Sequence, residues 1–295
     1  MRKEEIKKAV RDRYGKIAQK AGSCCLPAAS CCGSGNAVDN ISMGVGYRPE
    51  DLQAVPEGAN LGLGCGNPVA LASLKEGETV VDLGAGAGFD CFLAAKGVGK
   101  SGRVIGVDMT PEMLDKARDN ARKGKYENVE FRLGEIENLP VADNIADIII
   151  SNCVINLSPD KGRVFLEAFR VLKPGGRLMV SDIVLLKKLP TALRDSVAAY
   201  TGCVAGALMK DDYLREIGAA GFQDVEIIAE TLFPMQELVS HPAVKEAVVP
   251  SDTLLNMAEQ LTASIASIKV YAVKGRNHER YYEQRKEMAA QRNPF

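Results

Sequence analysis

The sequence predicts an α/β protein built on a doubly wound parallel sheet, and two observations predict it. Between residues 79 and 182, short apolar β-prone runs alternate with helical patterns, which is typical of parallel strands joined by crossover helices. The first run leads into the glycine-rich segment Asp82-Leu83-Gly84-Ala85-Gly86-Ala87-Gly88. Such a strand-to-helix turn is where open parallel sheets bind nucleotides.

Helix-capping signals mark the boundaries between the expected strands. Thr110-Pro111-Glu112 and Ser158-Pro159-Asp160 each place a capping residue and a proline where a helix begins. Lys173-Pro174-Gly175-Gly176 ends the helix before the fifth strand. The expected strands cover residues 79–83, 103–108, 129–133, 147–151 and 177–182, and a short helix covers residues 89–96.

The flanking regions predict an N-terminal extension and a smaller C-terminal region. Residues 3–20 carry an apolar stripe at helical spacing, whereas residues 22–48 are rich in Gly, Ser, Ala and Cys and are expected to be loop-like. Runs at 222–228 and 266–273 are strand-like. We therefore expect a helical and Cys-rich segment over 1–60, a cofactor-binding domain over 61–228 with an edge that 266–274 could complete, and a C-terminal region over 229–295.

Composition excludes several function classes. Lys and Arg number 37 and Asp and Glu number 38, so there is no basic field to attract nucleic acid or an anionic membrane. The N-terminus has no apolar signal region, and the longest apolar stretch, around residues 145–157, is interrupted by polar side chains. We expect a cytoplasmic protein. In that reducing compartment its 8 cysteines argue for chemical roles rather than for a disulfide framework.

Polar residues at the strand ends define a candidate cofactor pocket. Glycines at the turn let the backbone approach a ligand closely. Phe89 occupies the position where a dinucleotide fold requires Gly or Ala, which disfavours NAD and FAD. Asp108 ends the second strand, where it can bind ribose hydroxyls, and Glu135 follows the third strand within reach of an adenine. The expected cofactor-binding residues are Asp82, Gly84, Gly86, Gly88, Asp108, Met109, Glu135, Ile136 and Asn152.

Three isolated cysteines are expected to border the same pocket. Cys65, Cys153 and Cys203 are well suited to holding a soft, thiol-seeking atom beside a cofactor. Cys91 lies inside a predicted helix and is expected to be a small buried hydrophobe. The chain has only 2 histidines, His241 and His278, too few for a Ser-His-Asp triad or a His-rich metal site. Their scarcity also weighs against an acceptor that needs a histidine base.

Over about residues 75–185, the chain resembles the Rossmann-like S-adenosylmethionine-dependent methyltransferases. The turn at 82–88 matches their first motif, and Leu172-Lys173-Pro174-Gly175-Gly176-Arg177-Leu178 matches the turn before their fifth strand. The resemblance implies S-adenosylmethionine as cofactor. Ser151-Asn152-Cys153-Val154 lacks the prolines that nucleic-acid methyltransferases carry after the fourth strand, so no nucleic-acid partner is expected.

Three further segments are similar to the arsenite methyltransferases. They are Gly62-Leu63-Gly64-Cys65-Gly66-Asn67-Pro68, Ser151-Asn152-Cys153-Val154-Ile155-Asn156-Leu157 and Gly202-Cys203-Val204-Ala205-Gly206-Ala207. The resemblance implies that Cys65, Cys153 and Cys203 bind trivalent arsenic from a small-molecule arsenical. It also implies an upstream cysteine, Cys32 or Cys31, that forms a disulfide with Cys65 during turnover. Glutathione or thioredoxin would reset that disulfide, and no metal cofactor is expected.

Alternatives remain for the N-terminal cysteines and for the activity. Cys24, Cys25, Cys31 and Cys32 could capture arsenic or resolve the disulfide, form an inert segment, or bind structural zinc. The protein could instead methylate another small molecule, such as a quinone carbon, or serve as a non-enzymatic arsenic or metal sensor. The intact glycine turn with Asp108 and Glu135 argues against the sensor. The retained cysteine segments argue against the quinone acceptor.

Overall fold

A computed structural model describes residues 2–20, 35–189, 194, 197–232 and 264–276. Four expected thiols, those of Cys24, Cys25, Cys31 and Cys32, lie outside the described residues, as do His241 and His278.

One seven-stranded sheet organises the molecule, with strand order β3-β2-β1-β4-β5-β7-β6. The strands are β1 (Thr79–Leu83), β2 (Arg103–Asp108), β3 (Val129–Leu133), β4 (Ala146–Asn152), β5 (Leu172–Leu185), β6 (Phe222–Leu232) and β7 (Ile265–Lys274). The first five pair in parallel, while β7 runs antiparallel to both β5 and β6. The order reverses between β1 and β4. The doubly wound parallel sheet that the sequence predicts is confirmed.

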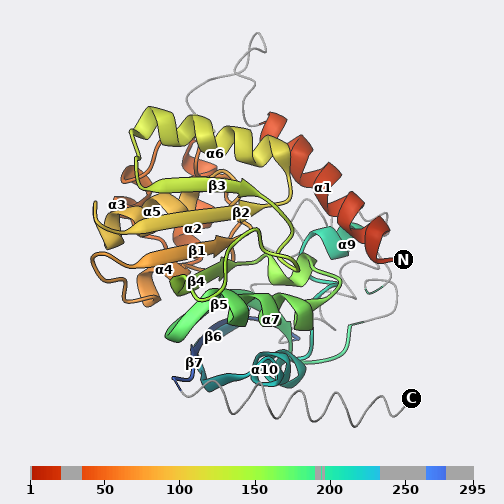
Figure 1. Cartoon of the computed structure of the whole chain (residues 1–295). Helices are drawn as coiled ribbons and strands as arrows, with labels where there is room; N and C mark the ends of the chain where they lie inside the picture. The colour runs from red at the N-terminus through yellow and green to blue at the C-terminus, as the bar shows by residue number, and fades with distance from the viewer. Residues whose placement is uncertain (1, 21–34, 190–193, 195–196, 233–263, 277–295) are drawn as a thin grey trace, which may run out of the picture.

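Helices cover both faces of this sheet (Figure 1). They are α1 (Lys3–Lys20), α2 (Gly35–Gly44), α3 (Pro49–Gln53), α4 (Pro68–Leu71), α5 (Phe89–Val98), α6 (Pro111–Gly124), α7 (Lys161–Val171), α9 (Val197–Thr201) and α10 (Lys210–Ala219), with a 3-10 turn η1 (Ile155–Leu157). Successive side chains of a strand face opposite sides of the sheet, so the strands contribute to two hydrophobic cores. Val80 and Ile148 pack with α4, α5 and α6, whereas Val81 and Ile149 pack with α7 and α10.

Hydrogen bonds satisfy backbone groups at both ends of α7. Asp160 caps the N-terminus, where its side chain accepts a hydrogen bond from the backbone N–H of Arg163 at 3.2 Å. At the other end, the buried amine of Lys274 on β7 donates to the carbonyl oxygens of Phe169 and Leu172, both at 2.7 Å. The antiparallel edge strand therefore satisfies carbonyls at the end of α7.

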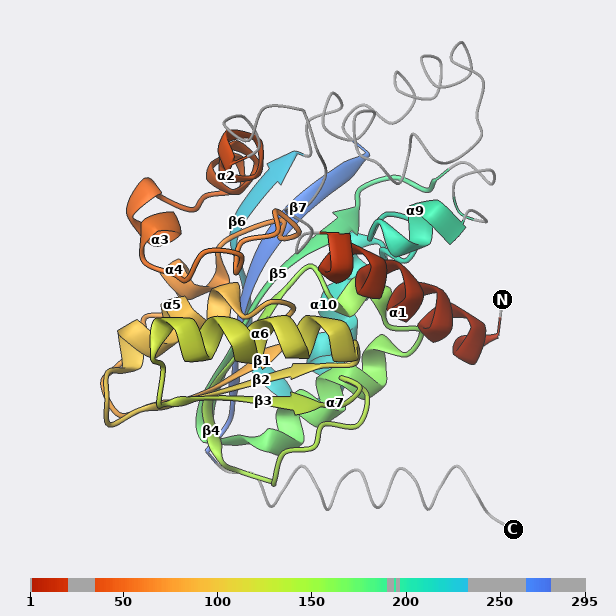
Figure 2. The same cartoon turned by 90° about the horizontal axis from the view of Figure 1, so that it is seen from above.

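The N-terminal extension is more helical than its composition suggests. Helix α1 covers the stretch where the sequence predicts one, and it lies beside α6 and α9 (Figure 2). The expectation of a loop over 22–48 is wrong for residues 35–44, which form α2. Val38 and Ser42 lie on its less exposed side, one helical turn apart, and the partly buried Val45 follows the helix. The Gly- and Ser-rich composition of the segment hid that short periodic pattern.

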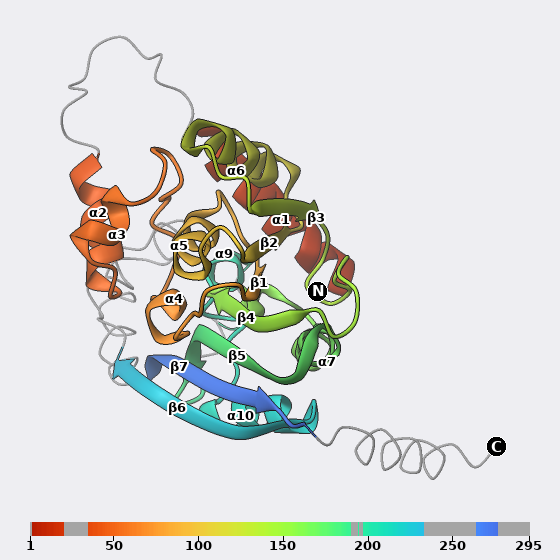
Figure 3. The ribbon, with the colours of Figure 1, turned by 60° about the vertical axis from the view of Figure 1, so that its left-hand side comes forward.

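Strands β6 and β7 complete the far edge of the sheet (Figure 3). Both were expected as strands, and β6 continues to Leu232. Helix α10, which the sequence analysis did not anticipate, packs against β6 and β5. It places Tyr213, which is fully buried, under the end of β5.

We expect the glycine turn to tolerate substitution unequally. A Cβ at Gly88 would lie 2.8 Å from ring atoms of Phe92 and Phe131, whereas a Cβ at Gly86 meets nothing within 4 Å. Both glycines have positive φ. Gly88→Ala should therefore lower the free energy of unfolding by roughly 2–4 kcal/mol, and Gly86→Ala by only about 1–2 kcal/mol. Urea unfolding of both variants checks this expectation. Equal losses would show that the rings around Gly88 move aside freely.

Candidate active site

A pocket of about 1110 Å³, open mouth included, lies at the carboxyl ends of the parallel strands, where the order reverses between β1 and β4. This is the position at which doubly wound sheets bind ligands. Of the cofactor-binding residues that the sequence predicts, the structure places Asp82, Gly84, Gly86, Asp108, Met109, Ile136 and Asn152 in its lining.

The glycine turn is fixed to the end of β2. The backbone N–H groups of Gly84 and Ala85 both donate to the carbonyl oxygen of Val107, at 2.8 and 3.0 Å. The carboxylate of Asp108 accepts from the N–H of Gly86 at 2.9 Å and of Thr110 at 2.8 Å. Burial raises the pKa of Asp108, and these backbone hydrogen bonds oppose the rise. A carboxylate has about four acceptor positions, so Asp108 can still accept from a ligand.

Two of the expected cofactor residues lie outside the pocket lining. Gly88 caps α5, and its Cα faces Phe92 and Phe131. Glu135 accepts a 2.6 Å hydrogen bond from Lys7 of α1. The adenine contact expected of Glu135 is therefore not supported by its position, because its carboxylate faces a cation on α1. Its near neighbour Glu137 lines the pocket instead.

Helix α1 is part of the site, which the sequence analysis did not foresee. Lys7, Val10 and Tyr14 line the pocket, and Lys7 joins α1 to the strand-end acids Glu135 and Glu137. The sequence feature that could have indicated this role is the apolar stripe of α1. Val10 and Tyr14, which predicted that α1 packs on the domain, also line the pocket.

A buried acid that the sequence analysis missed, Asp90, lies beside Asp82 in the pocket wall. Asp90 belongs to the first turn of α5. Burial raises the pKa of Asp82 well above its usual range and the pKa of Asp90 to about 6. The thiol of Cys91, buried as expected, donates to Asp82 at 3.2 Å. The pocket is therefore rich in carboxyl groups, which suits a ligand that carries positive charge.

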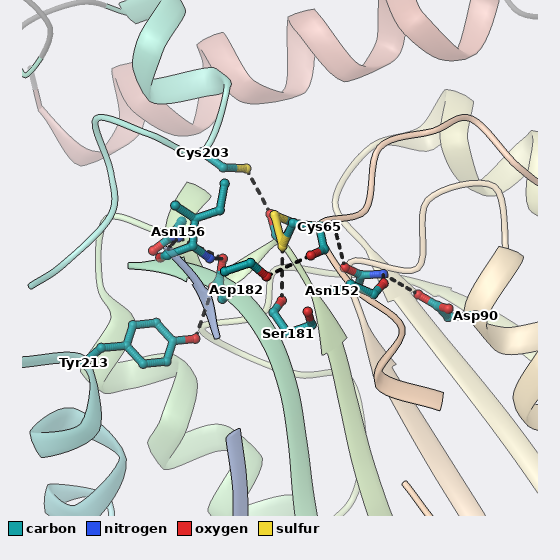
Figure 4. The surroundings of a disulfide bond; sticks show 12 residues. Cys65, Asp90, Asn152, Asn156, Ser181, Asp182, Cys203 and Tyr213 are labelled. Atoms are coloured by element: carbon teal, nitrogen blue, oxygen red, sulfur yellow. Dashed lines mark hydrogen bonds between the residues drawn. A yellow bond between two sulfur atoms is a disulfide. The ribbon is translucent and has the colours of Figure 1, made fainter. Parts of the chain in front are cut away.

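Asn152 connects this pocket to the first of the candidate thiols. Its amide nitrogen lies 2.8 Å from the Tyr47 hydroxyl, 2.8 Å from the Gly66 carbonyl and 3.0 Å from an Asp90 oxygen. Its amide oxygen accepts from the backbone N–H of Cys65 at 3.0 Å. Asn152 thus borders the pocket and orients the loop that carries Cys65 (Figure 4).

The structure brings Cys65, Cys153 and Cys203 into one buried apolar cluster. Cys65 and Cys153 are joined by a disulfide, with their Cα atoms 5.7 Å apart. The sulfur of Cys203 lies 3.0 Å from the carbonyl oxygen of Cys153 (Figure 4). The cluster also contains Val10, Leu157, Ile183 and Val204. Cys153 additionally lines the pocket, so one thiol position belongs to both environments.

The backbone at two of these cysteines is strained. Cys153 and Cys203 have φ values of +59° and +65°, in the left-handed region that residues other than glycine seldom adopt. Such a conformation costs on the order of 1 kcal/mol or more and persists only where surrounding structure enforces it. It gathers at functional sites more often than elsewhere.

The disulfide differs from the one expected. The resemblance implied that Cys65 pairs with Cys31 or Cys32, whereas the structure pairs it with Cys153. The physical reason is proximity: their Cα separation is within the usual range for a disulfide, because the loop around Cys65 is bonded to Asn152, the residue before Cys153. Cys31 and Cys32 lie outside the described residues.

Asp182 completes the surroundings of the thiols and was also missed. A carboxylate oxygen of Asp182 and the sulfurs of Cys65 and Cys153 lie within 4.8 Å of one another. The carboxyl accepts from Asn156 at 2.8 Å and from the Tyr213 hydroxyl at 3.1 Å. Burial raises the pKa of Asp182 to about 7.

The thiol of Cys203 is held in its neutral form. Burial and then the nearby Asp182 raise its pKa to about 12, while a hydrogen bond from Tyr14 and the charges of Lys161 and Arg13 oppose the rise. The thiol is therefore well protected from adventitious reaction, since the thiolate is the reactive form.

Among the described residues, no helix is long and apolar enough to cross a membrane.

Comparisons with known proteins give the class that the fold and the glycine-turn pocket define. A model for the methyltransferase domain matches residues 74–221. The chain therefore contains a methyltransferase domain, built on the doubly wound sheet.

Closer relatives narrow this class to one family. The arsenite methyltransferases of Halobacterium salinarum and Aquipseudomonas alcaligenes are 51% and 39% identical over 76% and 75% of this chain. The crystal structure of an arsenic(III) S-adenosylmethionine methyltransferase from Chlamydomonas reinhardtii superposes with a TM-score of 0.61 at 35% identity, covering 82% of this chain and 74% of that one. The chain belongs to the arsenite methyltransferase family. It spans 59% and 63% of the lengths of the two sequence relatives.

The carboxyl of Asp182 predicts a pH-dependent stability. An unfolded Asp loses its proton near pH 4, whereas folded Asp182 keeps it to about pH 7. Between these values the folded state binds more protons than the unfolded state, so this group makes the protein less stable as pH rises. Asparagine cannot titrate. Raising the pH from 4 to 8 should therefore lower the free energy of unfolding of the wild type by about 2–4 kcal/mol relative to that of Asp182→Asn.

Urea unfolding of both oxidised proteins across this pH range measures the shift. A difference between variant and wild type that does not change with pH would contradict the assignment.

Proposed function

We propose that this protein transfers a methyl group from S-adenosylmethionine to trivalent arsenic bound by Cys65, Cys153 and Cys203. One observation carries the proposal: residues far apart in the chain place these sulfurs in one apolar cluster, and Cys153 also lines the glycine-turn pocket. A soft atom held by the thiols would therefore lie at the wall of the cofactor site.

The residues of the pocket fit S-adenosylmethionine. Asp108 keeps acceptor capacity toward ribose hydroxyls, and the space at Gly86 lets a ligand approach the backbone. The buried acids Asp82 and Asp90 complement an ammonium group and a sulfonium centre. When bound, the cofactor supplies a methyl group on a cationic sulfur, which is a strong electrophile.

The thiol cluster suits a trivalent arsenical as substrate. Thiolate sulfur and arsenic are both soft and polarizable, by the same matching that pairs soft metals with cysteine. Arsenic bound by sulfurs keeps a lone pair directed away from them, so the acceptor needs no base. The protein then has mainly to hold the acceptor beside the pocket, and good positioning can supply up to about 7–11 kcal/mol of the barrier. Val10, Leu157 and Val204 exclude water from the thiols.

Turnover also needs electrons, because methylation formally raises arsenic from the trivalent to the pentavalent state. Two of the cysteine thiolates can reduce arsenic back to the trivalent state by leaving it together as a disulfide. A thiolate from a small thiol then binds arsenic in the methylated product in their place. The disulfide between Cys65 and Cys153 supports the proposal that two of these thiols can lose electrons as a pair. We propose that cytoplasmic glutathione or thioredoxin then restores the dithiol by exchange.

Replacing one arsenic ligand tests this function. Cys153→Ser should lower the arsenite-dependent formation of S-adenosylhomocysteine at least about 100-fold, because a neutral hydroxyl is a poor ligand for a soft atom. Its binding of S-adenosylhomocysteine should stay within about twofold of the wild type, since the pocket wall is otherwise unchanged. Calorimetry and a coupled assay with thiol reductant give the two quantities.

Cys91→Ser is the matched control, because Cys91 is buried, bonds to Asp82 and lies outside the thiol cluster. A Cys153→Ser protein that methylates arsenite at the wild-type rate would rule out the proposed chemistry.

A further inference from the structure

We propose that Tyr47 is a positioning residue that links occupancy of the cofactor pocket to the placement of Cys65, through hydrogen bonds to Asp90 and Asn152. The inference rests on the proposed function. It concerns how Cys65, the third arsenic ligand, is positioned relative to the methyl donor.

The first step is the placement of Tyr47. It lies in the connection between α2 and α3, remote in sequence from every strand end, yet it is buried and lines the pocket. Its ring meets Phe89 edge-on, with centroids 4.7 Å apart. Its hydroxyl donates to Asp90 at 2.6 Å and lies 2.8 Å from the amide nitrogen of Asn152, from which it accepts.

The second step is that Asn152 has no spare hydrogen. Its amide nitrogen has two hydrogens but three acceptors within hydrogen-bond distance, contributed by Tyr47, Asp90 and Gly66. The orientation of the amide therefore depends on all three. Removing one acceptor therefore changes how the amide hydrogens are shared between the other two. Tyr47 also orients Asp90 through its own hydrogen bond.

The third step connects the amide to Cys65. The other end of the amide accepts from the Cys65 N–H at 3.0 Å. The glycines on either side keep the loop close: a Cβ on Gly64 would lie 2.6 Å from the Asn152 nitrogen, and one on Gly66 would lie 1.8 Å from the Ser181 hydroxyl. Ser267 donates to the Cys65 carbonyl at 2.8 Å. Both ends of the Asn152 amide thus connect the loop to the pocket wall, at Cys65 and at Gly66.

The consequence is a coupling between two ligands. Tyr47, Asp90 and Asn152 all line the pocket, so a cofactor bound there contacts the group that orients Cys65. A bound cofactor that orders this network favours the position of Cys65 needed for the third arsenic ligand. By linkage, arsenic held by that thiol must favour cofactor binding to the same extent.

The test measures arsenite binding by the reduced full chain, with and without saturating S-adenosylhomocysteine. In the wild type, S-adenosylhomocysteine should tighten arsenite binding about tenfold. In Tyr47→Phe, which keeps the ring contact with Phe89, the tightening should fall below about twofold, and kcat should fall about tenfold with the KM for S-adenosylmethionine changed less than about threefold.

Gly64→Ala disturbs the same amide from the loop side and should show the same loss of coupling, and it carries the test if Tyr47→Phe does not fold. Tyr126→Phe is the matched control, because it removes a tyrosine hydroxyl that donates to the Ala54 carbonyl and lies outside the pocket. It should keep the full tightening.

Wild-type coupling and kcat in folded Tyr47→Phe and Gly64→Ala would overturn the proposal and leave the proposed function intact, as would a wild type whose arsenite binding ignores S-adenosylhomocysteine. A wild type that forms no S-adenosylhomocysteine with arsenite would instead overturn the function, and this inference with it.

Discussion

The side chain of Asn152 joins four parts of the chain at the end of β4. It bonds to the α2–α3 connection through Tyr47, to the cysteine loop through Cys65 and Gly66, and to α5 through Asp90. Leaving one of these groups unpaired in a buried site would cost about 1–3 kcal/mol, so the four segments are constrained to one arrangement. The loop around Cys65, the acidic pocket wall and the end of β4, which Cys153 follows, are all placed relative to this one amide.

This arrangement places two different chemical environments side by side. On one side is a pocket lined by Asp82, Asp90 and Asp108, which suits a cationic ligand. On the other is an apolar cluster around the three thiols, which suits a soft acceptor without charge. Helix α1 contributes to both, because Lys7 lines the pocket while Val10 belongs to the thiol cluster as well. The two reactants of a methyl transfer would meet at Cys153.

The sequence predicted most of the sheet, because the strands are short β-prone runs, most of them apolar, bounded by capping and glycine signals. The strands 79–83, 103–108 and 129–133 match the structure at both ends. It also pointed to the cysteines that gather at the site, through segments that resemble a known family. These are local signals, readable without knowledge of the fold.

The remaining features depend on contacts between distant residues. Tyr47 and Asn152 are 105 residues apart, and no pattern around Tyr47 marks it as part of a pocket. Asp90 and Asp182 are single acids without a motif. Glu135 follows the end of β3, as a cofactor contact would, yet Lys7, 128 residues earlier in the chain, donates a hydrogen bond to it. The disulfide pairing was likewise decided by how the loop around Cys65 packs on Asn152.

In the proposed function, three thiols from distant parts of the chain bind one arsenic atom beside the pocket. X-ray absorption at the arsenic edge, on reduced protein with one equivalent of arsenite, counts the sulfur ligands of that atom. We expect three sulfur neighbours and no oxygen for the wild type, with one sulfur lost in each of Cys65→Ser, Cys153→Ser and Cys203→Ser. Three sulfurs that persist in all of these variants would contradict it.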